Sequence, residues 1–144
     1  MKLKINNETL VEEFFECTRI VGIMASLKDY QFIWNINRQL EFNFRVNHSL
    51  EIQLKKKERI YYFSVYEYVV PSCCMIHYLY NNQFDGEYLL PEFKHLDFLW
   101  LMKGDDVSND SMSSVMQLIK PLPTVQLATE MSLEKIKNKQ HLIL

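Results

Sequence analysis

"LDFLWLM", residues 96–102, carries apolar side chains on both of the faces that an extended chain presents. A strand with one solvated face alternates apolar and polar residues, whereas a strand covered on both faces is a continuous apolar run. This run therefore predicts the central strand of a sheet. Asp97 near its start is the exception. Because a buried carboxylate must be satisfied, we expect Asp97 to be buried and hydrogen-bonded, tying a loop or a helix end to the central strand.

The elements after the central strand predict a βαβ unit. Residues 111–120 place apolar side chains at helical spacing and stop before Pro121. Residues 124–131 then form a predicted last strand, and Ser132 caps a short terminal helix. Strand–helix–strand crossovers are right-handed in nearly all proteins, so this unit has a predicted hand.

The first half of the chain supplies another strand and helix. Residues 14–24 are rich in β-forming residues of alternating polarity, and residues 27–40 place apolar side chains at helical spacing. We expect Ser26 or Asp29 to cap this helix and its apolar stripe to face the core. The stripe consists of Leu27, Tyr30, Ile33, Trp34, Asn37 and Leu40.

The middle of the chain predicts a meander. Residues 60–70 form the clearest strand, residues 73–80 its partner, and residues 87–90 a third short strand. Residues 41–59 are a connection that contains edge-strand pieces. We expect the charged run 55–59 at a solvated hairpin tip or on an edge strand, where such runs prevent aggregation.

The order strand, helix, meander, strand, helix, strand predicts a single α+β domain spanning the 144 residues. The predicted architecture is a two-layer sandwich: a mainly antiparallel sheet with ferredoxin-like βαβ elements and two main helices on one face. Residues 1–13 predict either a short strand with Leu3 and Ile5 or a helix turn that begins at Asn7 or Thr9.

Composition excludes several classes of protein. A net charge of −2 argues against binding duplex DNA through its phosphates, and three glycines leave no room for a glycine-rich phosphate loop. Three cysteines without a secretory signal predict reduced thiols in a cytoplasmic protein. No apolar run approaches the ~20 residues of a membrane-spanning helix, so we expect no membrane partner.

Residues 90–98, LPEFKHLDF, resemble the motif IPExxxVDY, and the chain is similar to the uncharacterised bacterial family named for it. The resemblance extends to the start of the first helix and to residues 122–144. It implies a bacterial protein with no known reaction, cofactor or substrate. Phe98 stands where the family name has tyrosine. The matching residues are Leu90, Pro91, Glu92, Leu96, Asp97 and Phe98, together with Lys28, Asp29 and Tyr30.

Glu92 and Asp97 are the candidate acid and base of an enzyme. In an extended chain their separation of five residues places them on opposite faces, some 16 Å apart. We favour a structural role for both carboxylates, because structural ion-pair networks also need such groups. The alternative is a cleft bounded by Lys28, Asp29, Glu92 and Asp97 that binds a small ligand.

No metal or cofactor is expected. Cys73, Cys74 and His77 have the residue types of a metal site. Strand alternation would place Cys74 on the opposite face from the other two, and a closed zinc site needs four ligands. We therefore expect core cysteines.

The last three residues, 142–144, are apolar, and we expect them to be docked because burying such side chains is favourable.

Three functions remain open. The first is a non-catalytic module that binds a protein partner or forms a homo-oligomer, because exposed aromatic residues are enriched in interfaces. The second is single-stranded RNA binding by an open aromatic sheet face. The third is a small-ligand binder or enzyme at Glu92 and Asp97. The aromatic residues concerned are Tyr61, Tyr62, Tyr66, Tyr68, Tyr78 and Tyr80.

Overall fold

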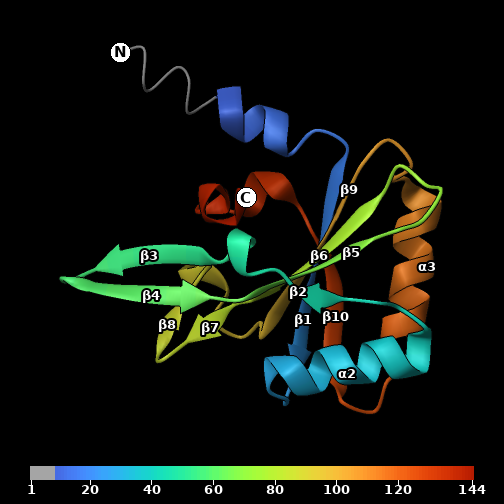
Figure 1. The fold of residues 1–144 in the computed structure, drawn as a ribbon, viewed down its shortest axis with the longest axis horizontal. Helices are drawn as coiled ribbons and strands as arrows, with labels where there is room; N and C mark the ends of the chain where they lie inside the picture. Colours follow the sequence, from blue (N-terminus) through green and yellow to red (C-terminus); the bar gives the residue numbers. More distant parts are fainter. Residues whose placement is uncertain (1–8) are drawn as a thin grey trace.

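The structure is a computed structural model that describes residues 9–144 (Figure 1). Its largest element is a six-stranded sheet in which all neighbouring strands are antiparallel. Helical segments accompany the sheet, so the predicted α+β class with a large antiparallel sheet is confirmed. In spatial order the strands are β10 (Val125–Met131), β1 (Thr18–Ala25), β9 (Phe98–Lys103), β6 (Ile76–Asn81), β5 (Val65–Val69) and β2 (Arg45–Val46).

Strand β9 lies between β1 and β6 and is covered on both faces. Its first five residues are at most 2% exposed. Because side chains alternate across a strand, Phe98, Trp100 and Met102 belong to a first core cluster, and Leu99 and Leu101 belong to a second. The predicted central strand is confirmed, and it begins two residues later than predicted.

Helices α2 (Asp29–Leu40) and α3 (Asn109–Ile119) both contribute to the first core cluster. Helix α3 begins two residues earlier than predicted because Ser108 caps it, accepting a hydrogen bond from the N–H of Ser111. In the described part of the chain, no helix is both long and apolar enough to cross a membrane. The buried helical residues are Phe32, Ile33, Ile36, Met112, Val115 and Ile119.

The segment before β1 is helical. Residues 9–14 form a helix, and β1 starts at Thr18, four residues later than predicted. The Thr18 hydroxyl donates to the carbonyl oxygen of Glu16 at 2.8 Å, which stabilises the intervening turn. The predictions that lie outside the described residues are those for Leu3, Ile5 and Asn7.

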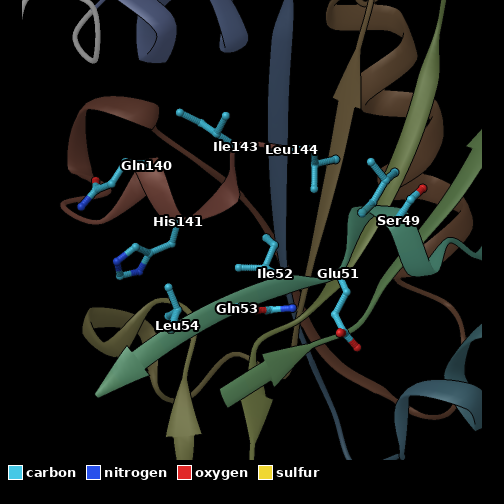
Figure 2. A pocket seen from close by; sticks show the side chains of 10 residues that line it. Ser49, Glu51, Ile52, Gln53, Leu54, Gln140, His141, Ile143 and Leu144 are labelled. Atoms are coloured by element: carbon cyan, nitrogen blue, oxygen red, sulfur yellow. The ribbon is translucent and has the colours of Figure 1, made fainter. Parts of the chain in front are cut away.

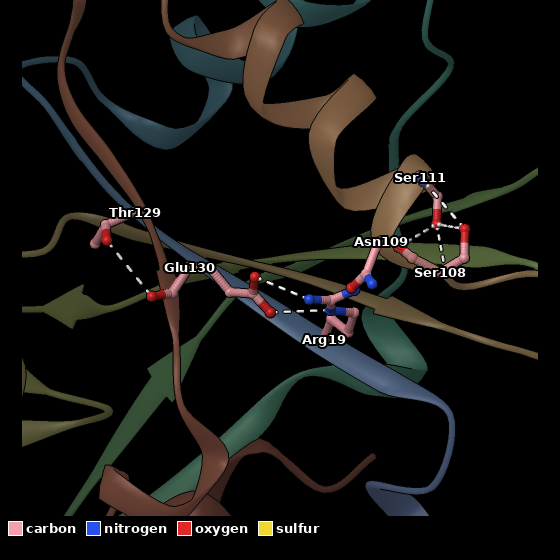
Figure 3. Close-up of polar contacts among 6 residues, drawn as sticks. All are labelled: Arg19, Ser108, Asn109, Ser111, Thr129 and Glu130. Atoms are coloured by element: carbon pink, nitrogen blue, oxygen red, sulfur yellow. Dashed lines mark hydrogen bonds and ion pairs between the residues drawn. The ribbon is translucent and has the colours of Figure 1, made fainter.

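Arg19 joins three elements (Figure 3). From β1, its Nε and Nη2 atoms donate to the carboxylate of Glu130 on β10 at 2.9 and 3.0 Å. Its Nη1 atom donates to the side-chain oxygen of Asn109, the first residue of α3. A bidentate pair of this kind is geometrically specific. Because both side chains of the pair are partly exposed, we expect it to stabilise the fold only slightly. It holds the Arg19 guanidinium in place, and the same guanidinium reaches Asn109 at the start of α3.

The predicted strand 60–70 is two strands in two sheets. Strand β4 (Arg59–Phe63) pairs with β3 (Ile52–Lys56), whereas β5 pairs with β2 and β6. The break falls at Ser64, whose carbonyl oxygen accepts a hydrogen bond from the N–H of Asn81. The charged run forms the tip of the β3–β4 hairpin, as predicted.

Two further predictions for the middle of the chain are wrong. Strand β8 (Glu87–Tyr88) pairs with β7 (Gln83–Phe84) in a separate hairpin and does not extend the meander. Strand β6 begins at Ile76, so Cys73 and Cys74 lie in a turn and not on strand faces. The reason is local hydrogen bonding: the Asp106 carboxylate accepts from the N–H of Cys74 and from the thiol of Cys73.

The C-terminal segment packs on its own chain, as predicted. It contains two 3₁₀ turns, η3 (Leu133–Lys135) and η4 (Lys139–Leu142). Leu142 is fully buried in the second core cluster, and its carbonyl oxygen accepts a hydrogen bond from the Tyr80 hydroxyl at 2.6 Å. Figure 2 shows the segment facing β3 across a pocket of about 300 Å³.

His77 on β6 is a buried polar residue that lies among aromatic side chains next to the first core cluster. Its Nδ1 atom accepts a hydrogen bond from Trp100 Nε1 at 2.9 Å, and its ring stacks on Tyr68. Burial lowers the pKa of His77 from 6.5 to about 4. The ring is therefore neutral in the fold at neutral pH, with Nδ1 free to accept.

We expect Leu142→Ala to lower the free energy of unfolding by about 2–5 kcal/mol, because it opens a cavity in the second core cluster. The matched control is Leu118→Ala, the same change at a leucine that is 42% exposed, for which we expect under about 1 kcal/mol. Urea unfolding measures both values. Equal effects of the two substitutions would contradict a docked C-terminal segment.

We expect the stability of the protein to fall as the pH drops from about 6.5 to about 4. In this window the unfolded His77 is protonated while the buried ring is not, so protonation favours unfolding. Lowering the pKa from 6.5 to about 4 corresponds to about 3 kcal/mol of stability, which is fully present above pH 6.5 and is lost as the pH falls to about 4. Unfolding free energies measured across this range test the expectation.

His77→Gln keeps an acceptor for Trp100 and removes the titrating ring, so it should flatten this pH dependence. His95→Gln, at an exposed position, should leave it unchanged. The account of His77 is wrong if His77→Gln and the wild type lose stability in parallel.

Candidate functional site

The loop that carries residues 90–98 is built around Asn82, which is fully buried. The Asn82 side-chain nitrogen donates to the carbonyl oxygens of Phe93 and Leu96 at 3.0 and 2.8 Å, and its side-chain oxygen accepts from the N–H of Leu90 at 2.8 Å. One amide thus satisfies three backbone groups. Asn82 was not predicted as a key residue, and its only sequence signal is an asparagine two residues after the predicted strand 73–80.

Asp97 ties the start of β9 to the end of β1. Its Oδ2 atom accepts a hydrogen bond from the N–H of Ala25 at 2.8 Å, and its own N–H donates to the carbonyl oxygen of Ile23. The predicted hydrogen bonding is confirmed, and the chain turns toward α2 directly after Ala25. The predicted burial is only partial, because the carboxylate also borders a cleft that is open to solvent.

Glu92 serves a different segment. Pro91 is the first residue of the 3₁₀ turn η2 (Pro91–Phe93), where its missing N–H costs nothing. The Glu92 carboxylate accepts from the N–H and the side-chain amide of Asn138 at 2.9 and 2.8 Å. Burial raises the pKa of Glu92, but the hydrogen bonds from Asn138 and nearby backbone outweigh it and lower the pKa. Glu92 therefore anchors the C-terminal segment.

The predicted cleft exists without Glu92. A cleft of about 580 Å³ lies between the start of α2 and the turn 81–85, and Lys28, Asp29 and Asp97 line it. The acid and base of the enzyme hypothesis are thus not brought together.

The three carboxylates that line this cleft already have partners. Asp29 accepts a hydrogen bond from the Tyr66 hydroxyl at 2.9 Å, and Asp85 forms an ion pair with Arg59. The third, Asp97, holds the backbone N–H described above. Burial, and then the hydrogen bond to Asp29, raises the pKa of Tyr66. These contacts hold the cleft walls in place.

Tyr30 and Trp34 face solvent and not the core, against our prediction. Tyr30 is 58% exposed and Trp34 is 57% exposed. Helix α2 carries apolar residues around most of its circumference, so it has two apolar stripes. Phe32, Ile33 and Ile36 fill the core, and positions 30 and 34 lie about a third of a turn from the centre of that group.

The α2 outer stripe, as we name it, consists of Leu27, Tyr30, Trp34 and Arg38. The first three residues, with Gln31 and Asn35, line a shallow depression of about 620 Å³. The Arg38 guanidinium lies over the Trp34 ring, 4.9 Å from its centre, in a cation–π contact. The outer stripe is the most aromatic exposed surface of α2.

The tyrosines predicted to be exposed are mostly packed. Tyr62 is 40% exposed, whereas the other five are partly or fully buried. Tyr66 and Tyr68 pack against the first core cluster, and Tyr61 and Tyr78 against the second. Neither face of the sheet presents a free row of aromatic rings.

The cysteine and histidine residues do not converge. His77 is buried against Trp100, and Cys73 and Cys74 lie in the turn with Asp106. Among residues 9–144, no three side chains of metal-binding type come together. None of the three cysteines forms a disulfide.

We expect Asp97→Ala to lower the free energy of unfolding by about 1–3 kcal/mol, because the N–H of Ala25, a residue only 1% exposed, loses its acceptor. Asp97→Asn retains an acceptor oxygen and should cost less. Asp105→Ala, at an exposed carboxylate, is the matched control with an expected change within about 0.5 kcal/mol. Chemical denaturation gives all three values. A cost of Asp97→Ala no larger than that control would refute the tie to Ala25.

Comparisons with known proteins were made at three levels: family models, curated proteins and solved structures. None of them finds a match to this chain.

Proposed function

We propose that this protein is a non-catalytic protein-interaction module whose binding surface is the α2 outer stripe. The observation that carries the proposal is the exposure of Tyr30 and Trp34, which are 58% and 57% exposed on adjacent turns of one helix. Tryptophan, tyrosine and arginine are the residue types most enriched among binding hot spots. The stripe contains one of each.

The local geometry of the stripe favours binding. Arg38 stacks on Trp34 and so restricts the indole before any partner arrives, which reduces the entropy lost on binding. Tyr30, Trp34 and Arg38 follow one another at the helical spacing of four residues, so their side chains form a continuous row, and Leu27, just before the helix, lines the same depression. A wholly buried aromatic residue buries about 150–250 Å², and Tyr30 and Trp34 each have more than half of their surface left for a partner to cover.

Two observations weigh against the other candidate functions. An enzyme at Glu92 and Asp97 lacks support because these carboxylates hold separate backbone segments. RNA binding lacks support because the sheet tyrosines pack into the core clusters and leave no stacking platform.

We further infer a ferredoxin-like arrangement with α2 and α3 on one face of the sheet. The spatial order β10-β1-β9-β6 and the shared first core cluster support it. We propose membership of the bacterial IPExxxVDY family on the motif at residues 90–98. A cytoplasmic location is proposed because the three cysteines are free thiols.

The proposed function is tested in cells that express the protein with an aromatic photo-crosslinking amino acid at position 34, which keeps an aromatic ring at that position. We expect a cross-linked protein partner at position 34 and none at position 60, an exposed isoleucine on the β3–β4 hairpin. The partner is then identified and purified, and its affinity is measured by calorimetry. Trp34→Ala should weaken binding by about 2 kcal/mol or more, as hot-spot truncation does.

The same substitution should change the free energy of unfolding by no more than about 1 kcal/mol, because Trp34 is exposed. Ile60→Ala is the matched control for binding and should leave the affinity unchanged. A partner whose affinity is insensitive to Trp34→Ala, or cross-linking that is equal at positions 34 and 60, would falsify the proposal.

A further inference from the structure

We propose that the α2 outer stripe binds the same stripe of a second copy of this chain, with the two α2 helices antiparallel and Trp34 near the twofold axis. This inference rests on the proposed function and names the partner of that surface. It follows from the order of side chains along α2 and from the charges at the two ends of the helix.

The stripe is complementary to itself when it is reversed. In an antiparallel pair centred on Trp34, Tyr30 of one copy faces Arg38 of the other, because both lie four residues from the centre. The arginine side chain can then contact an aromatic face across the interface as it contacts Trp34 within one copy. The two Trp34 rings meet at the axis. In a twofold interface, a contact between residue i of one copy and residue j of the other is repeated between residue j of the first and residue i of the second. The contact between Tyr30 and Arg38 therefore occurs twice.

The charges at the helix ends are the second observation. Lys28 is the N-cap residue of α2 and Glu41 is its C-cap residue, and both are exposed. Each has the sign that its own helix end disfavours, because the N-terminus of a helix is partly positive and the C-terminus partly negative. Within residues 9–144 neither side chain has an ion-pair partner.

Antiparallel pairing of the two α2 helices gives both of these charges a partner of opposite sign. It places Lys28 beside Glu41 of the second copy, and it does so twice because of the twofold symmetry. Each cap residue also lies next to the helix end of the partner that favours its charge. A parallel pair would instead bring like charges together at both ends.

The size of the contact determines how strong the dimer is. Tyr30 and Trp34 are 58% and 57% exposed, so a little over half of their surface is left to bury, and the two aromatic residues of each copy bury about 350–600 Å² in total. This area lies below the roughly 1,200–2,000 Å² of a standard interface. The dimer is therefore weak, and the dimeric fraction depends on the protein concentration. We expect dissociation constants in the micromolar range or above.

The experiment is sedimentation velocity of the full chain over a range of concentrations, with five samples. These are the wild type, Trp34→Ala, Lys28→Glu, Glu41→Lys, and an equimolar mixture of the last two variants. We expect a concentration-dependent dimer in the wild type. Trp34→Ala should raise the dissociation constant about thirtyfold. Each charge variant should raise it about fivefold, because attraction becomes repulsion at two symmetric contacts.

The mixture is the decisive sample. In a heterodimer of Lys28→Glu with Glu41→Lys, both end contacts pair opposite charges, so dimerisation should return to at least the wild-type level. Restoration also shows that both variants are folded. Fluorescently labelling one variant distinguishes the heterodimer from homodimers.

Two outcomes overturn this inference. One is a wild type that stays monomeric up to millimolar concentration. The other is a dimer unaffected by Trp34→Ala or not restored in the mixture, which would assign dimerisation to another surface. The proposed function then stands if the position-34 cross-link identifies a different protein, and it fails as well if position 34 gives no specific cross-link.

Discussion

The structure depends on one constraint, which is that β9 must be covered on both faces. Five consecutive apolar side chains in a strand cannot be buried by one layer, because alternate residues point in opposite directions. Helices α2 and α3 meet this need in the first core cluster. The β3–β4 hairpin, the loop after Asn82 and the C-terminal segment meet it in the second. Each of these segments is connected to β9 through side chains that bury against it.

The polar residues around the start of β9 hold this covering in place. Asn82 organises the loop, Asp97 holds the end of β1, and Glu92 holds the C-terminal segment at Asn138. A buried backbone group without a partner is costly, so irregular chain next to an apolar strand needs such side chains. The motif at residues 90–98 therefore acts as a structural junction between three parts of the chain.

The residues of α2 that stabilise the fold and those of the proposed binding surface lie on different sides of the helix. Phe32, Ile33 and Ile36 pack in the core, whereas Tyr30 and Trp34 lie about a third of a turn further round the helix and face solvent. We therefore expect substitutions in the first group to lower the stability of the fold and substitutions in the second to leave the core intact. An exposed tryptophan contributes little to the free energy of unfolding, which makes the outer stripe available for an intermolecular contact.

The amino-acid sequence by itself determined the central strand, the βαβ order of the second half, the hairpin tip at the charged run and the hydrogen bonding of Asp97. These follow from local periodicity and from the cost of an unsatisfied polar group. Only the tertiary structure decided three further points: the break at Ser64, the attachment of Glu92 to Asn138 and the outward direction of Trp34. The first two depend on strand pairing and contacts between distant residues. The third depends on which of two apolar stripes of α2 meets the sheet, and periodicity is the same for both.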